Sequence, residues 1–447
     1  MTGVLGRRLC PDCRVGRRLT NHQAAVEHDS YRSNRECNDN SERTKHRFHH
    51  NYHIAPGFDP VSRIADANRA MADGEFVIVS AEARLARVPV DPPRGDAIQQ
   101  FDALELPIVE LTDRAGRRGV GFGYTIGTGG SAILSLIHDE LLPAILAQDA
   151  RPIAALMRRL TKHIHALTPG CISSTALAAI DIALWDLAGR RTNTPVYLLL
   201  GGAHDRVRLY NTHVGWLNRP LDEMVDLCEQ AVRRDGFTAL KLKVGKPDVE
   251  EDCERVSKVR EAVGPRTTIM VDANQSWTID TAIGRMRRLE RYDLYWIEEP
   301  LEATDLDGFA RLGQHTSVPR AGGESLYSPA AFHECIRRGA LDVLQPDIAR
   351  IGGITNAIAV CHLAAAANLP VAPHVSPELS ATVACAVSNS VFVEYIPQME
   401  PILKRPVTRR NGFAVPFDTP GHGIEFDPEA LERFTVTRNN VKRSPVS

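Results

Sequence analysis

The second half of the chain alternates short apolar runs with longer stretches in which apolar residues recur every three or four positions. Between the runs at 240–244 and 269–274, the apolar residues fall on one helical face, and Gly264 and Pro265 end that pattern. Repeating strand and helix units of this length predict a parallel (β/α) barrel. We expect its strands at 207–212, 240–244, 269–274, 294–299, 318–323, 343–347, 371–374 and 391–395.

The part of the chain before the barrel has strand patterns first and helical patterns later. Residues 76–85 and 106–111 are expected strands, and a hairpin turn is expected at 113–116. The clearest helix is expected to begin at a cap formed by Ser173 and Ser174 and to end near Gly189. These patterns predict an α+β domain within roughly the first 200 residues.

Residues 1–70 lack any sustained apolar period and are rich in Arg, His, Asn and Ser. Cys10, Cys13 and Cys37, followed by histidines at 46, 49, 50 and 53, superficially suggest zinc, but the second tight ligand pair of a structural zinc site is missing. We therefore expect an unstructured extension, or a start codon placed too early with Met71 as the alternative start.

Composition narrows the class of protein. The chain has 447 residues, 43% of them hydrophobic, as in ordinary globular proteins, and a formal net charge of −2 that predicts neither nucleic-acid nor membrane binding. No apolar run approaches the roughly 20 residues that cross a bilayer, and no secretory signal is recognisable at the N-terminus. Most of the nine cysteines are scattered through apolar segments, which indicates buried, reduced thiols in a cytoplasmic protein.

Ionisable side chains stand at or near the end of nearly every predicted barrel strand. In a (β/α) barrel the carboxyl ends of the strands meet at one mouth, where catalytic groups lie. A ring of such side chains there is a specific signal, because chance would scatter them into helices and loops. In strand order they are Lys241, Lys243, Asp272, Asn274, Glu298, Glu324, Asp347, His374 and Glu394.

Three of these carboxylates suit a metal ion. Asp272, Glu298 and Glu324 follow one another at equal spacing, since 298 − 272 = 26 and 324 − 298 = 26. They would therefore stand at similar depth on consecutive strands. Carboxylate oxygens are the ligands that Mg²⁺ prefers, and three of them leave room for water and substrate oxygens. Each alone would be an ordinary strand-end carboxylate, but the three together predict a Mg²⁺ site.

Two pairs of residues could move protons. Lys241 and Lys243 point to the same face of their strand, and mutual repulsion and burial are expected to lower the pKa of their ammonium groups toward the range of a general base. Alternatively they are solvated, or they are partners of neighbouring carboxylates. Asp347 and His374 end neighbouring strands, so the carboxylate could orient the imidazole. Removing the proton beside a carboxylate creates an enediolate, whose charge a divalent ion would stabilise.

At these residues the chain resembles the mandelate racemase subgroup of the enolase superfamily. The matching segments are 178–186, 240–244, 270–274, 296–300, 323–324, 345–347 and 372–374. The resemblance implies a modified (β/α)7β barrel under an N-terminal α+β cap. It also implies four parts of the chain: the extension 1–72, the cap 73–204, the barrel 205–400 with the active site, and a C-terminal segment 401–447 that returns to the cap.

The resemblance also implies roles for the strand-end residues. Asp272, Glu298 and Glu324 would bind one Mg²⁺, Lys243 would be one acid/base with Lys241 beside the substrate carboxylate, and His374 paired with Asp347 would be the other. Glu394 would hydrogen-bond the substrate carboxylate, and Asn274 would lie near the metal.

The chain is particularly similar to acid-sugar dehydratases acting on galactarate and talarate, through residues 210–216 and 241–275. The expected reaction is loss of water from an acid sugar to give a 2-keto-3-deoxy acid. A racemase or epimerase of a 2-hydroxy acid uses the same bases, and a non-catalytic homologue is a third alternative. The expected partner is a small acid-sugar substrate, and a homo-oligomer is also expected.

Two loops of the cap, 91–100 and 124–131, are expected to cover the barrel mouth and select the substrate. In them, Arg94 could bind a distal carboxylate or be a solvated loop arginine, Asp96 or Gln99 could contact hydroxyls, and Tyr124 is a candidate substrate-binding residue.

Overall fold

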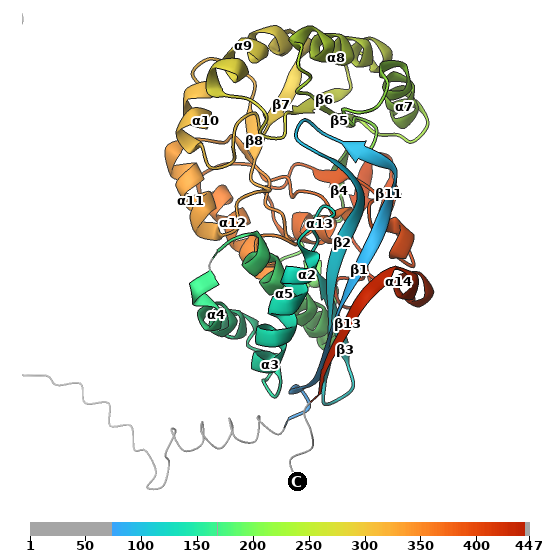
Figure 1. The fold of residues 1–447 in the computed structure, drawn as a ribbon, viewed down its shortest axis with the longest axis vertical. Coiled ribbons are helices and arrows are strands. Elements are labelled where there is room, and N and C mark those ends of the chain that lie inside the picture. Colours follow the sequence, from blue (N-terminus) through green and yellow to red (C-terminus); the bar gives the residue numbers. More distant parts are fainter. Residues whose placement is uncertain (1–73, 168, 443–447) are drawn as a thin grey trace, which may run out of the picture. The chain divides into compact units, whose positions relative to one another are not determined.

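The computed structural model describes residues 74–167 and 169–442, shown as coloured ribbon in Figure 1. The extension 1–72 and its zinc-like pattern therefore lie outside the described residues. The described chain contains a sheet of four antiparallel strands with helices packed on it, and a ring of parallel strands surrounded by helices.

The cap sheet is built from three consecutive strands and the last strand of the chain. Its order is β13-β1-β2-β3, so the C-terminal strand pairs with the first strand of the cap. The hairpin turn expected at 113–116 joins β2 to β3. The strands β1 and β2 are much longer than predicted, because they continue to pair with each other beyond the alternating apolar stretch. The bounds are β1 Ile78–Gly95, β2 Gln100–Asp113, β3 Arg118–Phe122 and β13 Thr435–Lys442.

Five α-helices and two short non-α turns lie between β3 and the barrel. The central one, α5, begins before the predicted serine cap: Gly170 is the cap residue, and its N–H donates to Oγ of Ser173 at 3.1 Å. The helix also continues past Gly189, because Asn193 in the left-handed conformation ends it. The bounds are α2 Gly130–Leu136, η1 Ile137–Leu141, α3 Leu142–Ile145, α4 Ile153–His163, η2 His165–Leu167, α5 Cys171–Thr192 and α6 Val196–Leu199.

The helix α5 is the core helix of the cap. Glycines on β3 let it approach closely, since a Cβ added at Gly121 would lie only 2.1 Å from the carbonyl oxygen of Ala179. In length and composition α5 could cross a membrane, which corrects the expectation that no such run exists. Its residues are nearly all buried against the cap sheet and the neighbouring helices, so its apolar character is explained by packing.

The barrel strands run in parallel order β4-β5-β6-β7-β8-β9, and β10 pairs with β4. Helices lie outside the strands, as Figure 1 shows for α7 to α12. The strands are β4 Val207–Asn211, β5 Ala239–Lys243, β6 Thr268–Asp272, β7 Leu294–Glu298, β8 Arg320–Gly322, β9 Val343–Leu344 and β10 Val393–Tyr395. The helices are α7 Leu221–Arg233, α8 Val249–Val263, α9 Ile279–Leu289, α10 Leu306–Leu312, α11 Pro329–Arg338, α12 Ile354–Ala366 and α13 Pro377–Ala386, with the turn η3 Glu290–Tyr292 after α9.

The expected strand at 371–374 is reduced to single bridges. Val371 pairs in parallel with Leu344 and with Ser390, so it still connects the β9 side of the barrel to the β10 side. Pro370 and Pro373 flank this position, and neither has an N–H to donate to a ladder. The segment therefore closes the barrel without forming a regular strand, and it carries His374 to the mouth.

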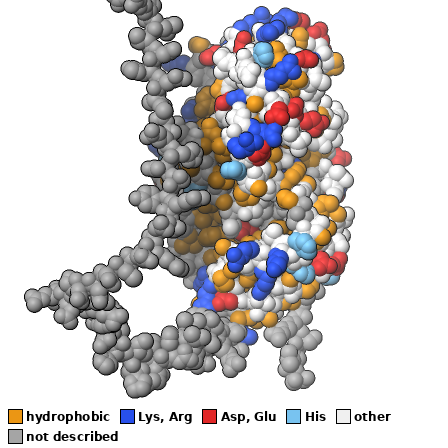
Figure 2. All heavy atoms as spheres, turned by 90° about the vertical axis from the view of Figure 1, so that its left-hand side faces the viewer, with side chains coloured by type: hydrophobic (Ala, Val, Ile, Leu, Met, Phe, Trp, Pro, Cys, Tyr) orange, Lys and Arg blue, Asp and Glu red, His pale blue; other side chains and the backbone are white. Residues whose placement is uncertain are grey.

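The chain after β10 connects the barrel to the cap. β12 pairs with β4 of the barrel, and β13 then joins the cap sheet. The elements are η4 Glu400–Ile402, β11 Thr408–Arg410, β12 Phe413–Val415 and α14 Pro428–Phe434. On the face shown in Figure 2, basic and acidic side chains of the described residues are interspersed rather than gathered by sign.

Aromatic side chains fill the inside of the barrel below the mouth. Tyr210 and Trp296 meet edge to face at 5.3 Å between ring centroids, and Phe392 packs against both. All three are fully buried. This packed aromatic layer lies directly below the strand-end side chains, since Nζ of Lys241 is 5.3 Å from the centroid of the Tyr210 ring.

Candidate active site

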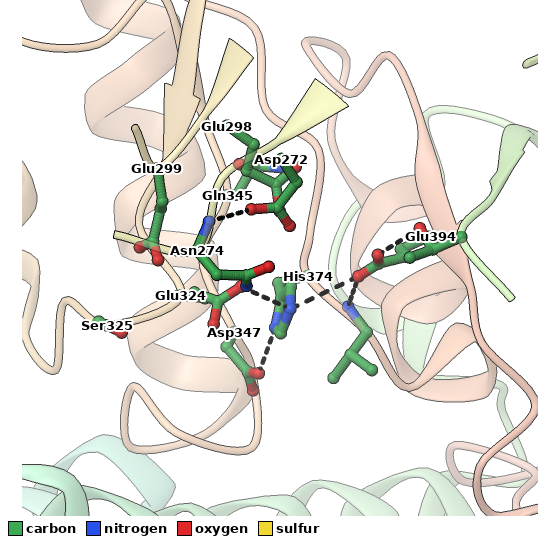
Figure 3. A network of polar contacts seen from close by, with 12 residues as sticks. Asp272, Asn274, Glu298, Glu299, Glu324, Ser325, Gln345, Asp347, His374 and Glu394 are labelled. Atoms are coloured by element: carbon green, nitrogen blue, oxygen red, sulfur yellow. Dashed lines mark hydrogen bonds and ion pairs between the residues drawn. The ribbon is translucent and has the colours of Figure 1, made fainter. Parts of the chain in front are cut away.

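Polar side chains gather at the barrel mouth in a small cavity between the strand ends and the cap. The strand register explains why: Lys243 pairs with Asp272 across β5 and β6, and Asp272 pairs with Glu298 across β6 and β7. Glu324 follows two residues after β8. The equal spacing in the sequence thus corresponds to equal depth for Asp272 and Glu298, whereas Glu324 lies three residues beyond Ala321, the partner of Glu298 on β8. Figure 3 shows the three carboxylates around the mouth.

Each of the three predicted metal ligands is paired with a cation. Lys243 Nζ lies 2.6 Å from Oδ2 of Asp272, Lys241 donates to Glu298, and Nε2 of His374 lies 2.8 Å from Oε2 of Glu324. Among the described residues, no three carboxylate, histidine or cysteine side chains already surround a common point. The carboxylates are nevertheless close enough to repel one another.

Burial sets the charge state of this cluster. Burial raises the pKa of Glu298 to about 8, and the neighbouring carboxylates of Asp272 and Glu394 add to the rise. Burial acts on Glu324 as well, but the imidazole of His374 overcomes it and lowers the pKa of Glu324. A pocket with several carboxylates this close together gains from a divalent cation.

Two further oxygen atoms belong to the donor set. Oδ1 of Asn274 and Oε1 of Glu299 are buried and have no hydrogen-bond partner among the described residues. Figure 3 shows both side chains beside the carboxylates. Hard oxygen donors, four of them carboxylates, fit a hard divalent ion such as Mg²⁺ and do not fit a softer metal that prefers thiolate or imidazole.

The pKa values of Lys241 and Lys243 are raised, whereas the sequence predicted that they would be lowered. Burial favours the neutral amine, but Lys241 also faces Glu298, Glu394 at 2.9 Å and Asp272 at 3.3 Å, and these carboxylates raise its pKa well above the ordinary value. For Lys243, burial is likewise outweighed by Asp272, and the pKa is raised. The prediction of lowered pKa values was wrong because the facing carboxylates outweigh burial and mutual repulsion. The alternative, that the lysines are partners of these carboxylates, is confirmed.

His374 and Asp347 form the expected pair. Nδ1 of His374 lies 2.8 Å from Oδ2 of Asp347, which leaves Nε2 directed toward Glu324 and, at 3.5 Å, Glu394. Burial disfavours the charged ring, but Glu324 and Asp347 outweigh burial and raise the pKa of His374 well above its ordinary value. The imidazole is thus held with one nitrogen on its orienting carboxylate and the other facing the cavity.

Glu394 closes the ring of side chains at the end of β10. Its Oε1 accepts from the hydroxyl of Thr212 at 2.6 Å and lies 2.9 Å from Lys241, and its Oε2 accepts from the N–H of Val375 at 3.1 Å. Three donors therefore hold this buried carboxylate in place next to His374 and Lys241.

Three contacts were not anticipated from the sequence. The hydroxyl of Tyr124 donates to Oδ2 of Asp347 at 2.5 Å, Nε2 of Gln345 donates to Oε2 of Glu298 at 2.7 Å, and Nη1 of Arg350 lies 3.6 Å from Oε1 of Glu324. The position of Gln345, two before Asp347, was a usable signal, since it places both on one face of the expected strand 343–347. Arg350 lies in a turn and has no periodic signal.

The cap completes the cavity with the tip of the β1–β2 hairpin. Asp96 and Gln99 line the cavity together with Asn274, Tyr124 and Lys243.

Arg94 departs from its expected position. Its guanidinium packs over the ring of Trp216 at 5.5 Å, and the side chain is 6% exposed. It is neither on the cavity wall nor a solvated loop residue, because β1 remains a paired strand up to Gly95 and turns this side chain toward Trp216.

Comparison with known families identifies this arrangement. Residues 223–430 match the family model described as "Enolase C-terminal domain-like". Residues 77–201 match the family model described as "Mandelate racemase / muconate lactonizing enzyme, N-terminal domain". The chain belongs to the mandelate racemase/muconate lactonizing enzyme family. The resemblance read from the strand-end motifs is confirmed, and so is the fold class, a TIM-like barrel with an N-terminal α+β cap.

Members of this family that resemble the chain have several activities. A 3,6-anhydro-α-L-galactonate cycloisomerase from Streptomyces coelicolor is 36% identical, over 74% of this chain and 92% of its own length. An L-talarate/galactarate dehydratase from Salmonella typhimurium is 34% identical, over 87% of this chain and 99% of its own. The crystal structure of a racemase from S. coelicolor with bound magnesium has a TM-score of 0.78 at 34% identity, covering 80% of this chain and all (100%) of that one.

Proposed function

We propose that this chain is a Mg²⁺-dependent acid-sugar dehydratase, a carbon–oxygen lyase that converts an acid sugar into a 2-keto-3-deoxy acid. The observation that carries the proposal is that Lys243, His374 and Glu324 line one cavity. Asp272 contacts Lys243 there, and Glu298 is level with Asp272 on the next strand. The similarity to a talarate/galactarate dehydratase over nearly the whole described chain supports it.

The metal ligands follow from the donor set. Asp272, Glu298 and Glu324 would hold one Mg²⁺, and Lys241, Lys243 and His374 would then give up part of their present contacts with these carboxylates. When bound, the ion stabilises the negative charge that develops on the substrate carboxylate as the adjacent proton leaves. The magnesium in the related racemase structure supports this choice of metal.

The protein side chains supply the proton transfers. Lys243, in its neutral form, or His374 takes the proton from C2, and the electrons of that C–H bond move into the carboxylate to give an enediolate. Lys241, fixed by Glu298 and Glu394, places a positive charge beside this carboxylate.

Loss of the C3 hydroxyl completes the reaction. His374 presents Nε2 to the cavity because Asp347 occupies Nδ1. In its protonated form it donates a proton to the departing hydroxyl, so the C3–O bond breaks and water leaves. The resulting enol takes up a proton at C3 and becomes the 2-keto acid.

A racemase or epimerase of a 2-hydroxy acid is the second candidate. The specific observation in its favour is that a lysine and a histidine both line the cavity, since two proton-transfer groups allow removal of a proton from one face of C2 and return to the other. The related S. coelicolor racemase adds support.

One experiment separates these reactions. The purified chain is incubated with a library of aldonic and aldaric acids and Mg²⁺ in heavy water, and 2-keto acids are detected with semicarbazide while C2 deuterium is followed by NMR. Dehydration predicts a 2-keto acid, and racemisation predicts C2 deuterium without it. The absence of both, with every acid, contradicts the proposal. The matched control is the Lys243→Ala, His374→Asn double variant, which should yield neither product.

The cellular setting is also proposed. Cys228, Cys253, Cys335, Cys361 and Cys385 are buried free thiols, as expected in a reducing compartment, so we place the enzyme in the cytoplasm. A homo-oligomer remains our expectation, which light scattering of the purified chain tests.

A further inference from the structure

The wall of the cavity formed by the cap has an unusual charge pattern. Among the described residues that line the cavity, Lys243 and His374 are the only basic ones, and both serve proton transfer at C2. The hairpin tip contributes the carboxylate of Asp96 and the amide of Gln99, and the segment after β10 contributes the amide of Gln398. Substrate atoms remote from the metal ligands therefore meet one negative charge and neutral amides.

Asp96 is fixed in this wall. Its Oδ1 accepts hydrogen bonds from the backbone N–H groups of Ile98 and Gln99, each at 2.9 Å. These bonds hold the tip of the hairpin and use only one carboxylate oxygen. Asp96 lines the same cavity as Lys243. Its second oxygen is available to accept a hydrogen bond from a ligand.

The nearest arginine of the hairpin does not offset this charge. Arg94 packs over Trp216 and lies close enough to Arg219 for their charges to interact, while Trp216 itself forms the cavity wall. The wall at this point is thus an aromatic ring beside acceptor groups. Such a ring packs against the C–H face of a sugar chain, whose hydroxyls then reach neighbouring polar groups.

We propose that the substrate is a polyhydroxy monocarboxylate of the aldonate type, and that Asp96 selects it against the corresponding diacid. This inference rests on the proposed acid-sugar chemistry. The single carboxylate lies at the metal end, and a hydroxyl of the chain donates to Asp96. The second carboxylate of a diacid has no proton to donate at neutral pH and is repelled by Asp96. The relatives do not decide between a monoacid and a diacid substrate. One is named for an anhydrogalactonate, which has one carboxylate, and another for galactarate, which has two.

The test uses acids of matched configuration: D-galactonate with galactarate, and D-gluconate with D-glucarate. For each acid, kcat/KM is measured with Mg²⁺, and the Kd is measured by calorimetry for the Mg²⁺-loaded enzyme. Asp96→Asn keeps the size of the side chain and an oxygen for the two backbone donors, and thermal melts verify its fold. Asp102→Asn is the matched control, because Asp102 is an exposed carboxylate on the same hairpin, paired with Arg87.

The wild type should prefer the better monoacid over its diacid partner by at least about 10-fold in kcat/KM or in Kd. Asp96→Asn should narrow this ratio by about 5-fold or more, and Asp102→Asn should leave it unchanged. If the wild type prefers the diacid or treats both acids equally, the inference is overturned while the dehydratase proposal stays intact. The same holds if Asp96→Asn leaves the monoacid-to-diacid preference unchanged. If no acid reacts, exchanges its C2 proton or binds, both proposals fail together.

Discussion

The hydroxyl of Tyr124 donates a hydrogen bond to Oδ2 of Asp347 across 2.5 Å, although the two residues are 223 positions apart in the chain. Tyr124 comes from the cap and Asp347 from the end of a barrel strand. The same oxygen of Asp347 lies 2.8 Å from Nδ1 of His374. The cap therefore contributes directly to the group that orients the imidazole, and docking of the cap on the barrel is part of building the active site.

Removal of that hydroxyl tests its role. Tyr124→Phe should lower kcat by ~10-fold while changing KM little, because one hydrogen bond to a charged group is lost and Asp347 is held less firmly. Steady-state kinetics with the best acid sugar measure this. Tyr292→Phe is the control, because Tyr292 lies in the turn η3 and does not line the cavity, and it should behave as the wild type. A wild-type kcat in Tyr124→Phe would show that the contact does not position the pair.

The two proton-transfer groups should be separable by variants. Lys243→Ala and His374→Asn should each lower the dehydration rate by about 10²–10⁴-fold, the usual contribution of a general acid or base. If one of them alone abstracts the C2 proton, the other variant should still exchange C2 deuterium without forming product. NMR in heavy water measures both quantities. Dehydration at the wild-type rate by either variant would remove that residue from the mechanism.

Metal binding should be visible in stability as well as in activity. Mg²⁺ at 100 times its Kd should stabilise the folded chain by ~2.7 kcal/mol, because the ligands are brought together only in the folded state. Removal of the ion with EDTA should abolish activity. Glu324→Gln should weaken the thermal shift caused by Mg²⁺, whereas Glu254→Gln, an exposed carboxylate on α8, should not. Equal shifts in both variants would argue against Glu324 as a ligand.

The buried carboxyl of Glu378, behind the segment that carries His374, should make stability depend on pH. Burial raises the pKa of Glu378 to about 7 from an ordinary 4.5. Since the folded state holds the proton more tightly, the stabilisation is complete below pH 4.5 and is lost as the pH rises through 7.

Glu378→Gln should remove this dependence. Relative to the wild type, the variant should gain up to about 3 kcal/mol between pH 4.5 and pH 8, measured by urea unfolding at each pH. The exposed Glu254→Gln should show no such gain. A difference between Glu378→Gln and the wild type that stays constant with pH would contradict the assignment.

The strand-end residues were predictable because they depend on topology alone. Once a parallel barrel is inferred, residues such as Asp272 and Glu298 at the ends of consecutive strands must meet at the mouth, and the register confirms that they are level. The pairing of Asp347 with His374 followed from the same rule.

What failed depends on three-dimensional packing. The pKa of Lys241 could not be inferred from its lysine neighbour, because carboxylates from β7 and β10 dominate its surroundings. The direction of Arg94 is fixed by Trp216, from a different part of the chain. The expected strand at 371–374 is reduced to single bridges at Val371, because Pro370 and Pro373 have no N–H to donate. Whether a missing N–H interrupts a strand depends on which strands lie beside it.

The central claim is that Lys243 and His374 act on the C2 proton of a Mg²⁺-bound acid sugar. Its most direct test is proton NMR of the enzyme with Mg²⁺ and a panel of aldonic and aldaric acids in heavy water. We expect at least one acid to lose its C2 proton signal and give a 2-keto-3-deoxy acid, and the Lys243→Ala, His374→Asn double variant to do neither. Retention of the C2 proton by every acid at saturating Mg²⁺ would contradict it.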